Sequence, residues 1–365
     1  MKILFSVAHP AHVHLFKEMI WKLHDQNHNV IICARKKEAT IDLLNKFGFP
    51  YAVISETKPS QINLLMEQIQ RIIRFRRILS KFKPDLSIST MDPSLALASR
   101  LMSIPYICFA DTEHAKASIY GALPFTNAVL TPSCFRKGIG SKQILYNGYH
   151  ELAYLHPNHF TPNLDVLTEI SLTEGDPFII VRFVSWEASH DIGQHGIRDK
   201  ISLVKKLEQY GQVIITSEVK LPADLEKYRM TISPEKLHDL LYYAMLYIGE
   251  GGTTASEAAV LGTPSIYVSS LAGTMGNFIE LENTYHLIYS YKDEDSACSK
   301  AVELLQQPDL KTEWAKRRQT LLEDKIDVTA FMVWFVEHYP ESFSMMKDDP
   351  NIQDQFRPFD WSEKG

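Results

Sequence analysis

Short apolar segments alternate along the chain with longer stretches in which apolar residues recur at helical spacing. The short segments are rich in Ile, Val and Tyr, and several are apolar on both faces, as strands between two helical layers must be. In the first half the predicted strands are residues 3–8, 29–34, 51–54, 85–90, 105–110, 128–133 and 143–148, and the predicted helices are residues 16–26, 61–82 and 93–102. This alternation predicts βα units and a parallel sheet.

The same alternation starts again in the second half. The predicted strands there are residues 178–183, 212–217, 246–249, 264–269 and 286–291, and the predicted helices are residues 197–209, 234–244, 254–261 and 293–306. Between the halves, residues 156–163 are dense in Pro and Asn, which is typical of an interdomain connection. We therefore expect an α/β protein with two doubly wound domains, whose ligands bind beyond the carboxyl ends of the strands.

These patterns also predict the domain boundaries. We expect an N-terminal domain over residues 1–152, a C-terminal domain over residues 153–325 and a final helix over residues 326–340, most of which is strongly apolar. Residues 341–365 are polar and interrupted by prolines, which predicts a loosely held tail.

The charge balance argues against nucleic acid as a partner. The 365 residues carry 38 Lys and Arg against 44 Asp and Glu, a net charge of −6, so the chain lacks the positive field that non-specific nucleic-acid binding needs. Its 4 cysteines are scattered, which predicts neither a zinc site nor a disulfide framework and favours a cytoplasmic protein. No apolar run is long enough to span a membrane.

Residues 61–83 interleave Arg and Lys with Ile, Leu and Phe, and they allow two interpretations. A helix that covers the sheet and turns a basic face to solvent is favoured, because βα order requires a helix there. A helix bound peripherally to the inner face of a membrane is the alternative.

The strongest local motif runs from Gly249 to Pro264, where a strand ends in glycines and a new helix begins. Glycines let a ligand approach the backbone closely, and the free amides at a helix start attract phosphate. The candidates for this contact are Gly251, Gly252, Thr253 and Thr254. Glu257 lies one turn beyond Thr253, and its carboxylate is suited to accept hydrogen bonds from a pair of sugar hydroxyls. A tight strand–helix corner with a solvated Glu257 is the alternative.

With residues 232–241, this motif resembles the donor-nucleotide site of GT-B glycosyltransferases. It is particularly similar to the peptidoglycan N-acetylglucosaminyltransferase and to UDP-N-acetylglucosamine 2-epimerases. The resemblance implies that Glu257 holds the ribose of the nucleotide. Residues 148–155 resemble a segment typical of a GT-B-like family, domain of unknown function 354.

The resemblance extends over roughly residues 1–340, with matching segments at 7–13, 83–86 and 103–106. It implies the GT-B fold, in which two Rossmann-like domains face each other across a cleft. The acceptor is then expected on the first domain and the nucleotide sugar on the second, and the final helix packs back toward the first domain.

Several side chains of the first domain are catalytic candidates. His12 is expected in the first turn of a helix, whose positive end favours the neutral, base-competent imidazole. A capping or packing role is its alternative, and the neighbouring histidines compete with it. Asp92 follows one strand, and Asp111 and Glu113 follow the next; the resemblance to the epimerases implies acid–base work by Asp92 and Glu113, with helix capping the alternative for Asp92. The histidines diverge around a loop, so we expect no metal.

In the second domain, Arg182 ends a strand and is suited to neutralise a diphosphate; a salt bridge is the alternative. The resemblance implies that Thr274 and Asn277, on a loop after another strand, contact hydroxyls of the donor sugar, and an ordinary polar loop is the alternative. The resemblance to the epimerases also implies a histidine near the loop after the first strand of this domain, for which His190 and His195 are the candidates.

The sequence thus predicts a cytoplasmic glycosyltransferase that uses a nucleotide sugar, with UDP implied by the resemblance. We expect inversion at the sugar, no metal, no cofactor besides the donor, and a saccharide or lipid-linked acceptor, in the synthesis of cell-surface polysaccharide or glycoconjugates. An epimerase or hydrolase of UDP-N-acetylglucosamine is the main alternative, because it shares the fold. A GT-B module that binds glycan or nucleotide without turnover is the third.

Overall fold

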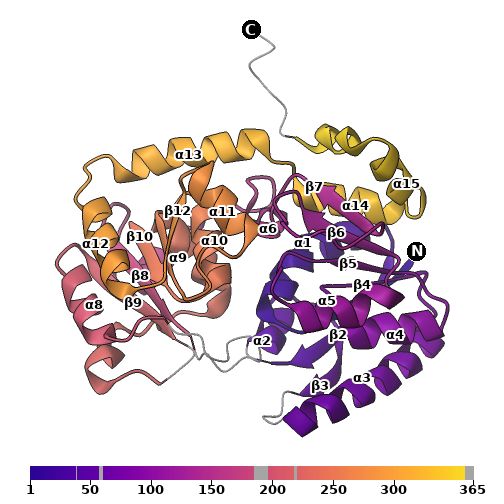
Figure 1. The fold of residues 1–365 in the computed structure, drawn as a ribbon. Helices are drawn as coiled ribbons and strands as arrows, with labels where there is room; N and C mark the ends of the chain where they lie inside the picture. Colours follow the sequence, from indigo (N-terminus) through magenta and orange to yellow (C-terminus); the bar gives the residue numbers. More distant parts are fainter. Residues whose placement is uncertain (38, 57–60, 185–195, 218–219, 358–365) are drawn as a thin grey trace. The chain divides into compact units, whose positions relative to one another are not determined.

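The computed structural model describes residues 1–37, 39–56, 61–184, 196–217 and 220–357. The chain divides into two compact units. Unit 1 combines Met1–His159 with the chain from Lys325 onward, and unit 2 is Phe160–Asp324 (Figure 1). The division falls inside residues 156–163, the segment that is dense in Pro and Asn.

Unit 1 is built on a 7-stranded sheet whose paired strands all run parallel, in the order β3-β2-β1-β4-β5-β6-β7. Its strands are β1 (Lys2–Val7), β2 (Asn29–Lys36), β3 (Tyr51–Glu56), β4 (Leu86–Ser89), β5 (Tyr106–Phe109), β6 (Ala128–Pro132) and β7 (Gln143–Tyr146). The order reverses direction at β1, as in a doubly wound sheet. Every strand predicted for this half is present, so the predicted parallel α/β architecture is confirmed for unit 1.

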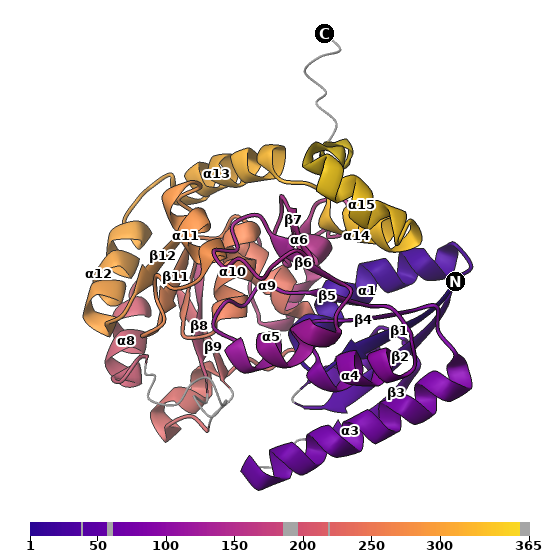
Figure 2. The same cartoon turned by 45° about the vertical axis from the view of Figure 1, so that its right-hand side comes forward.

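Up to His159, the chain of unit 1 forms helices between and after its strands. They are α1 (Pro10–Asp25), α2 (Thr40–Lys46), α3 (Gln61–Phe82), α4 (Pro93–Leu101), α5 (Lys116–Ala122) and α6 (Leu152–Leu155). The His9 ring accepts the Ala11 amide before α1, and a proline occupies the first turn of both α1 and α4. Helices α3 and α4 lie side by side (Figure 2). Within the described ranges, no helix is long and apolar enough to cross a membrane.

Unit 2 repeats the plan with a 5-stranded parallel sheet, in the order β12-β11-β10-β8-β9. Its strands are β8 (Phe178–Phe183), β9 (Gln212–Ser217), β10 (Leu246–Gly249), β11 (Ser265–Val268) and β12 (Ile288–Tyr291). The helices are α7 (Asp165–Glu169), α8 (Lys200–Leu207), α9 (Leu237–Tyr243), α10 (Gly252–Val260), α11 (Gly276–Asn283), α12 (Glu294–Leu305) and α13 (Leu310–Asp324). The predicted strands of this half are confirmed, whereas α7, α11 and α13 were not predicted.

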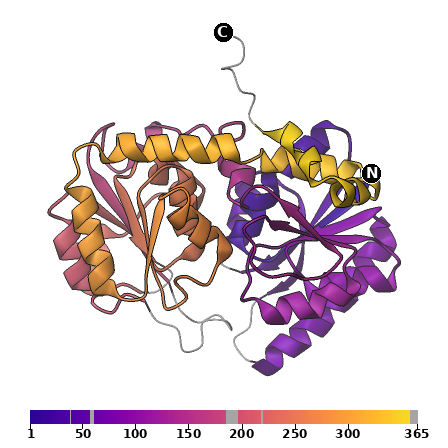
Figure 3. The same ribbon diagram turned by 45° about the horizontal axis from the view of Figure 1, so that its top comes forward.

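After α13 the chain returns to unit 1. Helix α14 (Val328–Glu337) packs on α1 and α6, and most of its side chains are buried. The Lys325 ammonium donates to Asn147 Oδ1 at 2.9 Å, and the Thr329 hydroxyl donates to the Ala153 carbonyl at 2.6 Å. Figure 3 shows this yellow segment beside the indigo start of the chain. The predicted apolar helix is therefore present, and it completes the core of unit 1.

The prediction of a loosely held tail from residue 341 is wrong as far as residue 356. That segment forms α15 (Glu341–Asp348) and the 3-10 helix η4 (Pro350–Phe356). Backbone groups of unit 1 hold it, since the Asn147 amide donates to Gln353 Oε1 at 2.7 Å and the Asp327 amide to the Phe356 carbonyl at 2.8 Å. These contacts could not be predicted, because a polar composition does not show which backbone groups the segment will bind.

Candidate functional site

The glycines after β10 allow the backbone to pass close to Arg182. A Cβ atom on Gly249 would lie 2.8 Å from the Arg182 carbonyl oxygen, and one on Gly251 would lie 2.7 Å from Arg182 Nε. Real Cβ atoms do not approach a backbone oxygen so closely, so Gly249 requires glycine, whereas a side chain at position 251 would have to displace the Arg182 side chain. The structure therefore brings the Arg182 guanidinium, which also donates to the Thr216 hydroxyl at 3.4 Å, against the turn that starts α10.

Helix α10 begins without a side-chain cap. Its N-cap residue is Gly251, which has no side chain that could accept a hydrogen bond from the amides of the first turn. Thr253 is exposed in that turn, whereas Thr254 is buried. Uncapped amides and the helix dipole attract an anion at this end, and the adjacent Arg182 adds a positive charge.

Glu257 is held in the second turn of α10. Its side chain is 5% exposed, and Oε1 lies 3.0 Å from Nε2 of His238, an equally buried residue of α9. A buried carboxylate is costly unless it is paired, and the imidazole supplies that pairing. The sequence motif identified Glu257 but not His238, because the pair spans separate helices.

The carboxylate of Glu250 binds two backbone amides that lie far from it in the sequence. Its carboxylate accepts the Val184 amide at 3.0 Å and the Ile197 amide at 2.7 Å, and the side chain is buried. These are the ends of the connection from β8 toward α8. A carboxylate that satisfies two backbone amides at once sets the spacing between them.

We expect Glu250→Ala to lower the free energy of unfolding by about 1.5–3 kcal/mol, because two amides lose a charged acceptor. Urea unfolding followed by circular dichroism measures the change. Glu250→Gln keeps one acceptor oxygen, so its free energy of unfolding should lie between those of the unaltered chain and Glu250→Ala. Equal stability of all three proteins would show that the two contacts contribute nothing.

The remaining candidates of unit 2 lie at the start of α11, which packs against α10. Thr274 is exposed, and its hydroxyl donates to the Leu271 carbonyl at 2.6 Å. Asn277 is buried, and its Oδ1 accepts the Phe278 amide at 3.0 Å. The predicted loop over 269–277 thus ends as the first turn of a helix. His190 and His195 lie outside the described residues.

In unit 1 the candidates surround the carboxyl ends of β1, β4 and β5. His12 Nδ1 accepts the Ala8 amide at 3.3 Å, and the Thr90 hydroxyl lies 2.9 Å from each ring nitrogen. Burial and the nearby His9 lower the pKa of His12 to about 3. At this pKa the His12 ring is neutral, but the nitrogen that would accept a proton is already engaged by a backbone amide.

Asp92 has a structural role that corrects its place among the catalytic candidates. Oδ1 caps α4 by accepting the Ser94 and Leu95 amides at 3.1 and 3.3 Å. Oδ2 accepts the Ser6 hydroxyl at 2.9 Å and pairs with the Arg71 guanidinium at 2.5 Å. The carboxylate is 6% exposed and both oxygens are used, so capping, the alternative interpretation, is the observed role.

The carboxylates after β5 differ in their surroundings. Glu113 Oε1 accepts the Arg136 amide at 3.3 Å. Asp111 accepts the Thr112 hydroxyl at 2.8 Å and pairs with His150 Nδ1 at 3.0 Å. Burial alone would raise the pKa of Asp111, but His150 outweighs it and holds that pKa well below its usual range. No group of His, Cys, Asp and Glu among the described residues is arranged to hold a metal ion.

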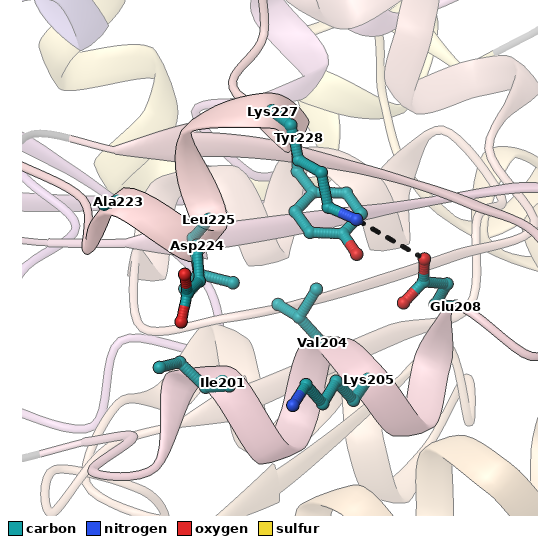
Figure 4. A pocket seen from close by; sticks show the side chains of 9 residues that line it. All are labelled: Ile201, Val204, Lys205, Glu208, Ala223, Asp224, Leu225, Lys227 and Tyr228. Atoms are coloured by element: carbon teal, nitrogen blue, oxygen red, sulfur yellow. Dashed lines mark ion pairs between the residues drawn. The ribbon is translucent and has the colours of Figure 1, made fainter.

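Two surface hollows of unit 2 do not contain the candidates. Figure 4 shows one of about 390 Å³ between α8 and the 3-10 helix η2 (Ala223–Tyr228), where Lys227 and Glu208 form an exposed ion pair of 3.9 Å. Another, of about 590 Å³, lies beside α13 at the amino ends of β8 and β10, next to Phe178 and Met245. The candidate residues instead gather at the carboxyl ends of both sheets, where doubly wound folds bind ligands.

Known proteins share this architecture at low sequence identity. The UDP-GlcNAc 2-epimerase of Neisseria meningitidis, solved bound to UDP-GlcNAc, is 14% identical with a TM-score of 0.59, over 86% of this chain and 94% of that one. The glycosyltransferase SsfS6 of Streptomyces sp. SF2575 is 12% identical with a TM-score of 0.58, over 93% of this chain and 100% of that one. The predicted GT-B fold is confirmed.

Sequence comparison defines the family. The uncharacterized protein MJ0665 of Methanocaldococcus jannaschii is 24% identical over 304 residues, which are 78% of this chain and 87% of that protein. A family model described as "Protein of unknown function (DUF354)" matches residues 1–335. Because this match covers most of its length, the chain belongs to the DUF354 family, and its two parallel sheets form the GT-B fold described above.

Proposed function

We propose that this protein is a glycosyltransferase that takes its sugar from a nucleotide sugar, with UDP as the nucleotide. The observation that carries the proposal is the buried Glu257, paired with His238, one turn after a helix start that has glycines and no side-chain cap. Such a carboxylate suits the two ribose hydroxyls, and the helix start suits the diphosphate. The glycosyltransferase and UDP-GlcNAc-bound structures that share the fold support the proposal.

In this proposal unit 2 binds the donor. The diphosphate lies against the amides of Gly251, Gly252 and Thr253, with the Thr254 segment behind them and Arg182 beside them. Thr274 and Asn277, at the start of α11, contact hydroxyls of the sugar. The positive ends of the helices stabilise the charge that develops on the departing diphosphate, which makes an inverting transfer without a metal reasonable.

Unit 1 binds the acceptor in this proposal. The acceptor is a saccharide or lipid-linked hydroxyl compound, and the reaction belongs to the synthesis of cell-surface polysaccharide or glycoconjugates on the inner side of the membrane. The basic residues of α3 that face solvent, among them Arg74, Arg76 and Arg77, are compatible with an anionic surface. Residues at the carboxyl ends of the unit 1 strands supply the acid–base chemistry.

An epimerase or hydrolase of UDP-N-acetylglucosamine is the second candidate. It is favoured by the titratable groups that gather after β5, where Asp111 pairs with His150 and Glu113 lies nearby in sequence. The structural similarity to a UDP-GlcNAc 2-epimerase also supports this candidate. The two candidates share the nucleotide site and differ in what happens to the sugar.

Proton NMR of the purified chain with UDP-N-acetylglucosamine, without an acceptor, tests the proposal. We expect saturation transfer to the uridine and ribose protons, with a sugar that changes only by slow hydrolysis. New N-acetylmannosamine signals would instead establish the epimerase. Absence of saturation transfer with UDP-N-acetylglucosamine and with UDP would contradict the proposed nucleotide.

A further inference from the structure

The Asp111–His150 pair joins two distant parts of unit 1 at the carboxyl edge of its sheet. Asp111 follows β5, and His150 lies in the turn between β7 and α6. Asp111 Oδ2 is 3.0 Å from His150 Nδ1, the His150 residue is 9% exposed, and the Asp111 side chain is 31% exposed. His150 is thus buried, whereas the Asp111 side chain is partly exposed to solvent.

The contact fixes which ring nitrogen of His150 carries the proton. A carboxylate accepts hydrogen bonds and donates none, so Nδ1 must hold a hydrogen. In the neutral ring the lone pair then resides on Nε2. That atom is buried and has no hydrogen-bond partner among the described residues. Buried polar atoms without partners are uncommon in native proteins, and a catalytic role is one explanation for them.

His12 has the opposite arrangement. Its Nδ1 accepts the Ala8 amide, and a backbone amide can only donate, so the lone pair of the neutral ring is on Nδ1 and already engaged. The nitrogen left over, Nε2, carries the hydrogen and can act only as a donor. Of these two rings, His150 alone therefore has a lone pair that no described residue engages.

The charges around His150 favour proton uptake. Burial would lower the pKa of His150, but the carboxylates of Asp111 and Glu151 outweigh it and raise that pKa above its ordinary value of 6.5. His12 of α1 opposes them only weakly because it is neutral. Tyr146 of β7 also stays neutral, since burial raises its pKa well above 10. The neighbours from β5, α1 and β7 thus leave the Asp111 and Glu151 carboxylates as the dominant charges.

We propose that His150 is the general base of the transfer, with Asp111 as the residue that positions its ring. The inference rests on the proposed function and names the atom that acts in it. Nε2 removes the proton of the acceptor hydroxyl as that oxygen forms its bond to the anomeric carbon. The bond from that carbon to the diphosphate breaks at the same time, and the nucleoside diphosphate leaves with the electron pair. The imidazolium is stabilised by Asp111 until its proton passes to solvent.

The first test reads the ring of His150 in the complete chain and needs no substrate. In a ¹⁵N-labelled sample, two-bond ¹⁵N–¹H spectra report the tautomer and pKa of each histidine, and His150→Gln assigns the signal. We expect the Nδ1–H tautomer above pH 8 and a pKa above 6.5, with Asp111→Asn returning the pKa toward 6.5 or below. An Nε2–H tautomer, or a pKa that Asp111→Asn does not move, would overturn the proposal.

The second test follows release of UDP from UDP-N-acetylglucosamine with water as the acceptor, by ³¹P NMR, alongside calorimetry of UDP binding. His150→Gln should slow release by about 10²- to 10⁴-fold while the affinity for UDP changes less than about threefold. The exposed His24 on α1 provides the matched control, and His24→Gln should leave both quantities unchanged.

The pH profile separates the two histidines. With His150 as base, release should rise with pH and level off only above pH 6.5, whereas a base with the pKa of His12 would give a flat profile from about pH 5 to 8. A chain that binds UDP and keeps turnover in His150→Gln contradicts the inference alone. A chain that does not bind UDP contradicts the proposed function and removes the reaction that the base would serve.

Discussion

Replacing Glu257 with alanine is expected to weaken UDP binding by about 10- to 100-fold. A hydrogen bond to a charged group contributes about 1.5–3 kcal/mol, which corresponds to about 10- to 100-fold in affinity, and in the proposed contact the two ribose hydroxyls share one carboxylate. The side chain is buried beside His238, so it is already ordered before the ligand arrives and pays little further entropy. Isothermal calorimetry with UDP measures the loss directly.

Two further variants make this result specific. Glu257→Gln keeps the size and one acceptor oxygen, so its affinity should fall between those of the unaltered chain and the alanine variant. The exposed Glu303 of α12, whose partner is the neighbouring Lys300, is the matched control, and Glu303→Ala should bind UDP normally. Unchanged affinity in Glu257→Ala, with normal thermal unfolding, would remove Glu257 from the nucleotide site.

Replacing Arg71 with methionine is expected to lower the stability of unit 1 by about 3–5 kcal/mol. The guanidinium and the Asp92 carboxylate are each about 6% exposed, so the variant leaves a charge buried without its main partner. Methionine fills much of the space of the arginine stem, which limits any effect of lost packing. Urea unfolding followed by fluorescence and circular dichroism measures the difference.

A double variant shows whether the charge itself is responsible. Asp92→Asn removes the charge and keeps an oxygen for the cap of α4, so adding it to Arg71→Met should recover much of the lost stability. The exposed ion pair between Arg357 and Asp354 supplies the contrast, since Arg357→Met should cost at most about 1 kcal/mol. Equal losses at the two arginines would show that the Arg71–Asp92 pair acts as an ordinary surface contact.

The sheets were predictable because their signal is local. Each strand is a short apolar run, and burial between two helical layers imposes that composition regardless of the neighbours. Helices α2 and α5 were not predicted because, at 7 residues each, they span only about two turns and show too little of the repeating pattern. Helix α13 escaped because it is largely charged and buries only a few residues, such as Leu310 and Trp314.

The candidate site was predictable to the extent that it depends on spacing within one segment. The glycines before α10 and the position of Glu257 can be recognised from the sequence, because a strand, a turn and a helix follow one another directly. His238 and His150 acquire their meaning from partners on other elements, Glu257 and Asp111, and no local pattern encodes such pairing. Asp92 illustrates the reverse, because its cap could be foreseen and its burial against Arg71 could not.

The return of the chain to unit 1 has a consequence for biosynthesis. Helix α14 fills the core of unit 1 beside α1 and α6, yet the ribosome makes residues 160–324 before it makes α14. At about 5–20 residues per second, that interval is on the order of 10 to 30 s. Throughout it the nascent N-terminal segment presents the apolar surface that Phe331, Met332 and Phe335 later cover. Unit 2 can therefore fold as a contiguous segment during translation, whereas unit 1, although begun first, is the last to be finished.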